Sequence, residues 1–116
     1  MPKALPVIDI SAPICCEPIS ASPPMGDDGA LELALRLKAL ADPARIRMIS
    51  ILMNADDVRS GDLAGRLGLS EPTVSHHLSQ LRKAGLVSSE RRGMSVYSRV
   101  NRDALDALRH VLTTCC

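Results

Sequence analysis

Two short amphipathic segments, separated by Gly68-Leu69-Ser70, constrain the fold of this chain more than any other feature. The first segment covers residues 61–67, and Ser60 can cap its N-terminus. The second begins after Ser70, which can cap it in the same way, and runs to about Lys83. Two short helices joined by so short a turn are typical of a helix-turn-helix, whose second helix lies in the major groove of DNA.

The second segment has two different faces when its residues are spaced by about 100° on a helix. Val74, Leu78 and Leu81 share one face, which we expect to pack on the preceding helix, and His77 turns toward that helix as a structural residue. The opposite face carries groups that suit base edges and phosphates, since Gln can bond adenine bidentately and Lys suits a phosphate. The expected DNA-binding residues of this region are Ser70, Thr73, Ser75, His76, Gln80 and Lys83.

Further helical patterns flank these two segments. Residues 30–40 carry apolar side chains over more than half of the helix surface, so this helix needs cover on more than one side. Asp42-Pro43 then starts a helix that runs to about Met53, because Asp can cap it and Pro suits its first position. Residues 54–58 are expected to form a connector, and residues 103–114 a last amphipathic helix.

A basic hairpin precedes the last helix. The β-prone runs 86–90 and 96–100 are joined by residues 91–95, which we expect to form the turn. This turn carries Arg91 and Arg92, placed to cross a phosphate backbone or to enter the minor groove. The complete order predicts a mainly α fold with a small β-hairpin, a winged helix-turn-helix.

The distribution of charge also favours a polyanionic partner. The net charge is only +1, yet residues 70–102 carry six cations against two carboxylates, a local charge of +4. Residues 1–28 have the opposite balance, −3. A basic half beside a helix-turn-helix indicates double-stranded DNA as the partner.

Proline divides the chain into an arm and a domain. Six of the eight prolines lie in the first 24 residues, and proline blocks helix and removes backbone donors. Residues 1–28 are therefore expected to be a flexible arm, and residues 29–116 a single domain for DNA binding and dimerisation. The chain has one tyrosine, no phenylalanine and no tryptophan, so its aliphatic core would gain from burial against a second subunit.

Several classes of protein are excluded by what the sequence lacks. It has no stretch of 18 apolar residues that would predict a membrane span, and Pro6 interrupts the apolar run that a secretory signal would need. We therefore expect a cytoplasmic protein, in which thiols stay reduced. The sequence also lacks the HExxH, CxxC and glycine-rich phosphate-binding patterns, which argues against an enzyme.

The cysteines form two adjacent pairs, Cys15-Cys16 in the arm and Cys115-Cys116 at the C-terminal end. Neighbouring cysteines close a disulfide only in a strained ring, whereas thiolates select soft, thiophilic ions. As(III) or Sb(III) takes three thiolates in a pyramid, which one pair and one further cysteine could supply. A tetrahedral ion such as Zn(II) or Cd(II) takes four ligands and would need both pairs. Incidental terminal cysteines and a redox-sensing thiol are the alternatives.

Two longer motifs resemble a known family. Residues 38–50, Lys-Ala-Leu-Ala-Asp-Pro-Ala-Arg-Ile-Arg-Met-Ile-Ser, and residues 69–87, which begin Leu-Ser-Glu-Pro-Thr-Val-Ser-His-His-Leu, are similar to the ArsR/SmtB family of metal-responsive repressors. The resemblance covers about residues 30–112. It implies a homodimer, joined by the first and last helices, that binds operator DNA and releases it when a metal or metalloid binds.

The inducer site is where this sequence departs from the family's usual pattern. Many members carry a Cys-x-Cys before Asp-Leu, but the corresponding residues here are Val58 and Ser60. The Cys15-Cys16 pair instead resembles an arsenic-responsive branch, whose third cysteine lies near the loop before the helix-turn-helix. Residues 54–58 contain no cysteine, so a third thiolate would have to come from Cys115 or Cys116. The resemblance thus implies As(III) or Sb(III) as inducer. A Cd(II) or Pb(II) sensor, a thiol redox switch, and a protein-interaction module that no longer binds DNA remain open alternatives.

Overall fold

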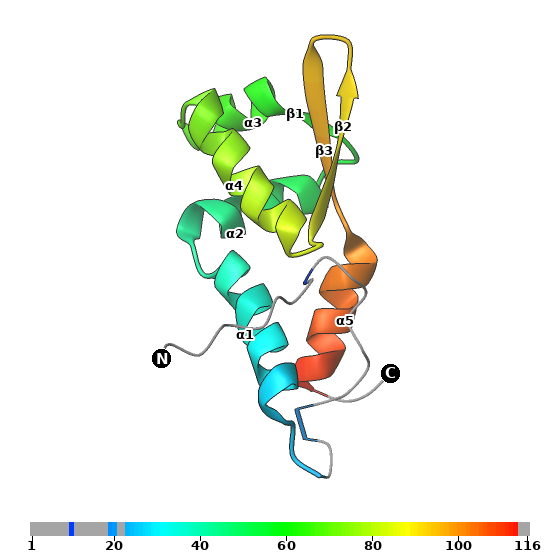
Figure 1. Cartoon of the computed structure of the whole chain (residues 1–116). Coiled ribbons are helices and arrows are strands. Elements are labelled where there is room, and N and C mark those ends of the chain that lie inside the picture. The colour runs from blue at the N-terminus through cyan, green and yellow to red at the C-terminus, as the bar shows by residue number, and fades with distance from the viewer. Residues whose placement is uncertain (1–9, 11–18, 21–22, 114–116) are drawn as a thin grey trace, which may run out of the picture.

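The computed structural model describes residues 10, 19–20 and 23–113. Five helices and three strands follow one another along the chain (Figure 1). Their order is α1 (Asp27–Leu40), α2 (Pro43–Met53), β1 (Val58–Arg59), α3 (Ser60–Leu67), α4 (Glu71–Lys83), β2 (Val87–Arg92), β3 (Ser95–Val100) and α5 (Arg102–Leu112). This order confirms the predicted winged helix-turn-helix, with α3 and α4 as its two helices and the β2–β3 hairpin as its wing.

The molecule has two ends with different contents. Figure 1 shows α1 and α5 at one end, while α3, α4 and the wing lie at the other and α2 lies between them. The wing rises beside α3 and α4 as a long, narrow ribbon. The helix-turn-helix and the wing therefore share one end of the molecule, away from α1 and α5.

Local hydrogen bonds explain where α2 and α4 begin. The carboxylate of Asp42 accepts hydrogen bonds from the backbone N–H groups of Ala44 and Arg45, at 2.8 and 3.3 Å. At α4, Oγ of Ser70 accepts from the N–H of Thr73 at 3.4 Å. Both caps were predicted, because Asp and Ser satisfy backbone donors that the first helical turn leaves free.

Gly68 makes the turn of the helix-turn-helix possible. It ends α3 in the left-handed region, with φ of +66°. A side chain is strained in this conformation, whereas glycine adopts it freely. The short turn between α3 and α4 therefore depends on this one residue.

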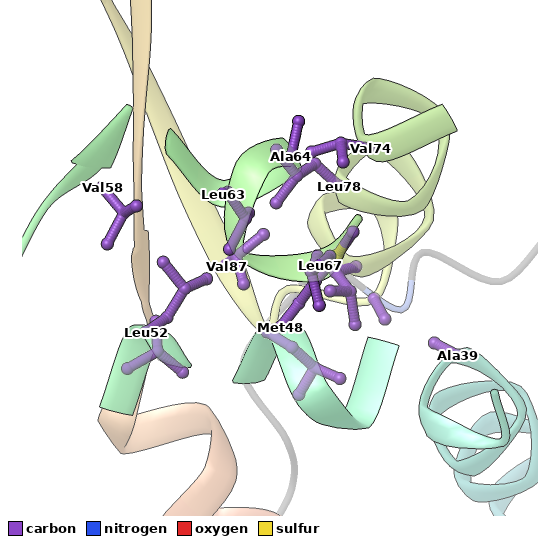
Figure 2. Packing of buried hydrophobic residues seen from close by; sticks show 14 residues of the cluster. Ala39, Met48, Leu52, Val58, Leu63, Ala64, Leu67, Val74, Leu78 and Val87 are labelled. Carbon is purple, nitrogen blue, oxygen red and sulfur yellow. The ribbon is translucent and has the colours of Figure 1, made fainter. Parts of the chain in front are cut away.

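One aliphatic core joins α2, α3, α4 and the wing (Figure 2). The predicted inner face of α4 is confirmed, since Val74, Leu78 and Leu81 are all buried. They pack with the core residues Met48, Leu52, Leu63, Leu67, Leu86 and Val87. A second, smaller cluster lies between α1 and α5 and consists of Leu33, Leu108 and Val111. This division places the helix that would read DNA in the larger core and the helices expected to dimerise around the smaller one.

The connector before α3 contains a strand that the sequence analysis missed. Val58–Arg59 forms β1 and pairs antiparallel with β3, Val58 opposite Ser98. The sheet thus has three strands in the order β1-β3-β2, where only a hairpin was expected. The prediction that Ser60 caps α3 is wrong. Ser60 is the first residue of that helix, and its Oγ donates to the carbonyl of Val96 at 3.3 Å.

The turn of the wing is shorter than expected. Strand β2 continues through Arg91 and Arg92, and β3 begins at Ser95, so Gly93 and Met94 alone form the tip. The prediction that both arginines lie in the turn is therefore wrong. Gly93, with φ of +62°, allows a two-residue turn because it adopts the positive φ that such turns require.

Among the residues that the structure describes, no helix is both long and apolar enough to span a membrane.

Helix α1 begins two residues before the domain boundary expected from the prolines, and Gly29 lies within it.

Candidate nucleic-acid interface

The predicted DNA-binding residues of α4 lie together on its surface. Thr73, Ser75 and His76 are exposed near its N-terminal end. Lys83 is exposed at its C-terminal end, and Gln80 is partly buried. These side chains project away from the buried face of the helix because the apolar and polar positions alternate with helical periodicity.

Ser70 and Thr73 also support the start of this helix. Their hydroxyl oxygens lie 2.8 Å apart, and Ser70 accepts from the backbone of Thr73. The N-terminal turn of α4 is therefore held by its own side chains. A capped, exposed helix N-terminus also presents backbone N–H groups and a partial positive charge, both of which suit phosphate.

Hydrogen bonds tie the wing to α4. Nη1 of Arg82, on α4, donates to Oγ of Ser89 at 3.0 Å. Oγ of Ser89 lies 2.8 Å from Oγ of Ser98 on the neighbouring strand, and Ser98 is fully buried. The face of the wing that carries Ser89 is thus the face turned toward α4.

The two arginines of the wing lie on opposite faces of the hairpin. Side chains alternate along a strand, so Arg91 shares the face of Ser89 that is turned toward α4. Arg92 lies on the other face, with its guanidinium 4.8 Å from the ring centroid of Tyr97. The sequence analysis treated the two arginines as equivalent, but of the two Arg91 alone lies on the face of the wing that is turned toward α4.

Arg92 is held by carboxylates on the outer face of the wing. Its Nη2 donates to Oδ2 of Asp57 at 3.1 Å and to Oε2 of Glu90 at 3.0 Å. Nε of Arg99 donates to Oδ1 of the same Asp57 at 3.1 Å. The hydrogen bond from Arg92 is the main reason why the pKa of Asp57 lies below its ordinary value.

Asp57 is a residue that the sequence analysis missed. It lies in the segment expected to be a connector, and its partners are 35 and 42 residues away in the chain. No local pattern identifies such a residue, because the sheet alone brings these positions together.

A groove of about 500 Å³ separates the wing from the N-terminal end of α4. It is lined by Glu71, Pro72 and Ser75 on the side of α4, and by Met94 and Ser95 on the side of the wing. Ser75 is thus the predicted DNA-binding residue of α4 that faces the wing across this groove, whereas Thr73, His76, Gln80 and Lys83 are not among its lining residues.

The predicted structural role of His77 is confirmed. The ring is partly buried, and its Nδ1 accepts a hydrogen bond from Nε of Arg45 on α2, at 3.1 Å. The neighbouring His76 is exposed, and the two ring centroids are 6.0 Å apart. Adjacent histidines therefore occupy different environments, as the helical pattern predicts.

The predicted metal ligands Cys15, Cys16, Cys115 and Cys116 lie outside the described residues. Within the described part of the chain, no three His, Asp or Glu side chains form a group that could hold a metal ion. The positions that align with the usual Cys-x-Cys are structural here, since Val58 belongs to the core and Ser60 bonds to the wing.

Comparisons with known proteins agree with this architecture. The family model described as "Bacterial regulatory protein, arsR family" matches residues 42–89. The transcriptional repressor SdpR of Bacillus subtilis is 38% identical over 68 residues, which are 59% of this chain and 74% of SdpR. The arsenic resistance transcriptional regulator ArsR1 of Pseudomonas putida is 39% identical over 64 residues, which are 55% of this chain and 50% of ArsR1.

A solved structure shows the same fold. The homodimeric winged helix-turn-helix DNA-binding domain of a possible ArsR-family transcriptional regulator from Mycobacterium bovis superimposes with a TM-score of 0.63 at 26% identity. The likeness covers 75% of this chain and 83% of that domain. This chain therefore belongs to the arsR family of bacterial regulatory proteins, and it is a winged helix-turn-helix transcriptional regulator rather than an enzyme.

Proposed function

We propose that this chain is a homodimeric repressor that binds a palindromic operator and releases it when As(III) or Sb(III) binds to cysteine thiolates. The observation that carries the DNA-binding part is the exposed polar surface of α4, at the same end of the molecule as the wing with Arg91 (Figure 1). Gln80 would read a base edge, and Lys83 and Arg91 would contact phosphates. The exposed side chains of Thr73, Ser75 and His76 add further donors and acceptors.

The homodimer would form through α1 and α5. These helices leave Leu37 37% exposed and Leu112 44% exposed beside the cluster of Leu33, Leu108 and Val111. A second copy would cover these side chains and enlarge a small aliphatic core. A two-fold dimer places two copies of α4 on half-sites about one helical turn of DNA apart, which is about 34–36 Å.

Selection from a random duplex library tests the DNA-binding part. We expect the selected duplexes to be palindromic, and their affinity, measured by fluorescence anisotropy, to fall steeply as salt is added. Absence of duplex binding even at low salt would instead support a protein-interaction module of the same fold.

The inducer site would combine cysteines from both ends of one chain. The backbone N–H of Ile19 donates to the carbonyl of Val111 at 2.8 Å, so Ile19 lies beside the end of α5. Cys16 is three residues from Ile19, and an extended chain spans at most about 11 Å over that length. Cys115, four residues after Val111, is within about 14 Å by the same measure.

These short chain lengths support a site of three thiolates within one subunit, because Cys16 and Cys115 each lie a few residues from the hydrogen bond between Ile19 and Val111. Arsenous acid would exchange its three hydroxyl groups for three cysteine sulfurs, and three water molecules would leave. Order imposed on the arm beside α5 would bias the dimer interface, which amounts to allostery if the ion binds the DNA-free state more tightly.

An operator gel shift titrated with As(III), Sb(III), Cd(II) and Pb(II) tests the inducer. Cys15→Ser with Cys16→Ser should bind the operator as the wild type does, yet fail to release it with As(III). Ser20→Ala with Ser22→Ala is the matched control in the same arm, and it should still respond. Normal release from the paired cysteine variant would show that the arm is not the sensor.

The same assay distinguishes the alternative inducers. Release by Cd(II) or Pb(II) alone would favour a tetrahedral or larger soft-metal site that uses both cysteine pairs. Release by an oxidant such as diamide, reversed by a dithiol, would favour a redox switch.

A further inference from the structure

Arg45 connects three helices through one guanidinium group. It lies in the first turn of α2 and is partly buried. Its Nε donates to Nδ1 of His77 on α4 at 3.1 Å, and its Nη1 donates to the carbonyl of Ala39 in the last turn of α1 at 3.4 Å. Arg45 thus links α1, the helix expected to dimerise, with α4, the helix expected to read DNA.

We propose that Arg45 and His77 are a positioning pair, which sets the orientation of α4 relative to α1. The inference rests on the proposed function, in which α1 belongs to the dimer interface and α4 enters the major groove. In such a dimer, the separation of the two α4 helices depends on the angle between α4 and α1 within each subunit. After a small rotation of α4, each subunit could still read its own half-site. The spacing of the two α4 helices would, however, no longer match the spacing of the two half-sites.

The chemistry of the pair makes the geometry specific. The guanidinium is planar and rigid, so bonds from Nε and Nη1 fix two directions at once. His77 accepts at Nδ1 only as the neutral tautomer with its proton on Nε2. Asp42, which caps the same turn of α2 by accepting from the backbone N–H of Arg45, holds this residue in place. Arg45 is therefore held by its own helix while it contacts the two others.

The fold does not depend on this pair alone. Val74, Leu78 and Leu81 hold α4 in the main core, and all three are buried. Loss of the bond from Arg45 to His77 would leave these contacts in place and remove one constraint on the tilt of α4 relative to α1. This separation allows a positioning role to be measured apart from stability.

The test compares two duplexes obtained by the selection above, the full palindrome and a duplex that retains one half-site. His77→Leu removes the acceptor at similar volume, and Arg45→Met removes the donor but keeps the apolar stem. For either variant, we expect the preference for the palindrome over the single half-site to fall about tenfold, while half-site affinity stays near that of the wild type. The double variant should lose no more than Arg45→Met alone, because the bond lost with His77 is one that Arg45→Met already removes.

Two matched controls sharpen this comparison. In His77→Gln the amide oxygen can still accept from Arg45, so the preference for the palindrome should be largely retained. Arg47→Met removes an exposed guanidinium from the same helix, and it should leave the preference unchanged. Thermal unfolding by circular dichroism identifies the folded fraction of each variant, and if Arg45→Met does not fold, the two His77 variants decide.

Equal loss on both duplexes, or no loss on either, would overturn the positioning role. Additive losses in the double variant would do the same. Wild-type protein that binds neither duplex would overturn the proposed function itself, and this outcome is distinct from the others because it requires no variant.

Discussion

Nη2 of Arg92 lies 3.1 Å from Oδ2 of Asp57, so a residue that follows α2 holds the outer face of the wing. The same carboxylate accepts from Arg99 on β3, so Asp57 is bonded to both strands of the wing. The wing is thus fastened to the body of the protein on both faces, by Asp57 on one and by Arg82 on the other. Its position relative to α4 is a property of the folded subunit.

Asp57→Asn should lower Tm at neutral pH and make the protein less sensitive to acid. The pKa of Asp57 is lowered, first by the hydrogen bond from Arg92, so its ionised form stabilises the folded state. This stabilisation is complete above the unfolded pKa of aspartate, about 3.9, and is lost as the pH falls through the lower, folded value. The difference in Tm between wild type and variant should therefore shrink below about pH 4. Asp56→Asn, at the exposed neighbouring position, is the control, and an equal effect from it would contradict the assigned role of Asp57.

Arg91→Ala should weaken DNA binding by a similar factor on every duplex and reduce the salt slope by about 1, because it removes one phosphate contact. Arg92→Ala should change the slope less, since Asp57 and Glu90 already hold that guanidinium. Gln80→Ala should instead lose discrimination at one base position, by about 1–3 kcal/mol. Anisotropy titrations at several salt concentrations measure these effects, and a base-selective loss from Arg91→Ala would argue against its place on a phosphate.

Leu63→Ala should destabilise the protein by about 2–5 kcal/mol, because Leu63 is fully buried in the main core and its removal leaves a cavity. Met94→Ala is a matched loss of apolar volume at a residue that is 98% exposed, and it should change stability by no more than about 0.5 kcal/mol. Urea unfolding followed by circular dichroism gives both values. Comparable effects would mean that α3 packs elsewhere than on this core.

Leu37→Glu with Leu112→Glu should convert the dimer to a monomer, because the carboxylates would be desolvated in the interface that α1 and α5 are proposed to form. Light scattering after size-exclusion chromatography measures the mass, and affinity for the palindrome should fall with it. Ile46→Glu places the same charge on an exposed apolar residue of α2 and should leave the dimer intact. A dimer that survives the double substitution would place the interface on another surface.

The helices could be predicted because their ends depend on neighbouring residues. Asp42, Ser70 and Gly68 act within three or four positions of themselves, through caps and a positive φ. The buried face of α4 likewise follows from the spacing of apolar residues along one helix. The sequence therefore predicts the helix-turn-helix and the buried face of α4 correctly.

The wing was predicted less accurately because its details depend on pairing between distant residues. Val58–Arg59 is too short to show the alternation of a strand, and it becomes a strand because it pairs with β3. The position of Gly93 was a usable signal, since glycine at the first place of a two-residue turn favours a tight hairpin. Read in that way, the sequence would have placed Arg91 and Arg92 in β2 and on opposite faces.

The contacts that fasten the interface could not be predicted at all. Arg45 and His77 are 32 residues apart, and although the helical pattern turns His77 inward, nothing in it identifies Arg45 as the partner. Their contact depends on how α2 crosses α4, which the apolar pattern does not specify.

Tyr97 lies beneath the guanidinium of Arg92, and it is the single tyrosine of a chain without tryptophan or phenylalanine. The tyrosine absorption and emission of the subunit therefore come from the wing alone. Recording tyrosine emission while an inducer is added would show, without any attached dye, whether inducer binding at the cysteine pairs changes the surroundings of β3.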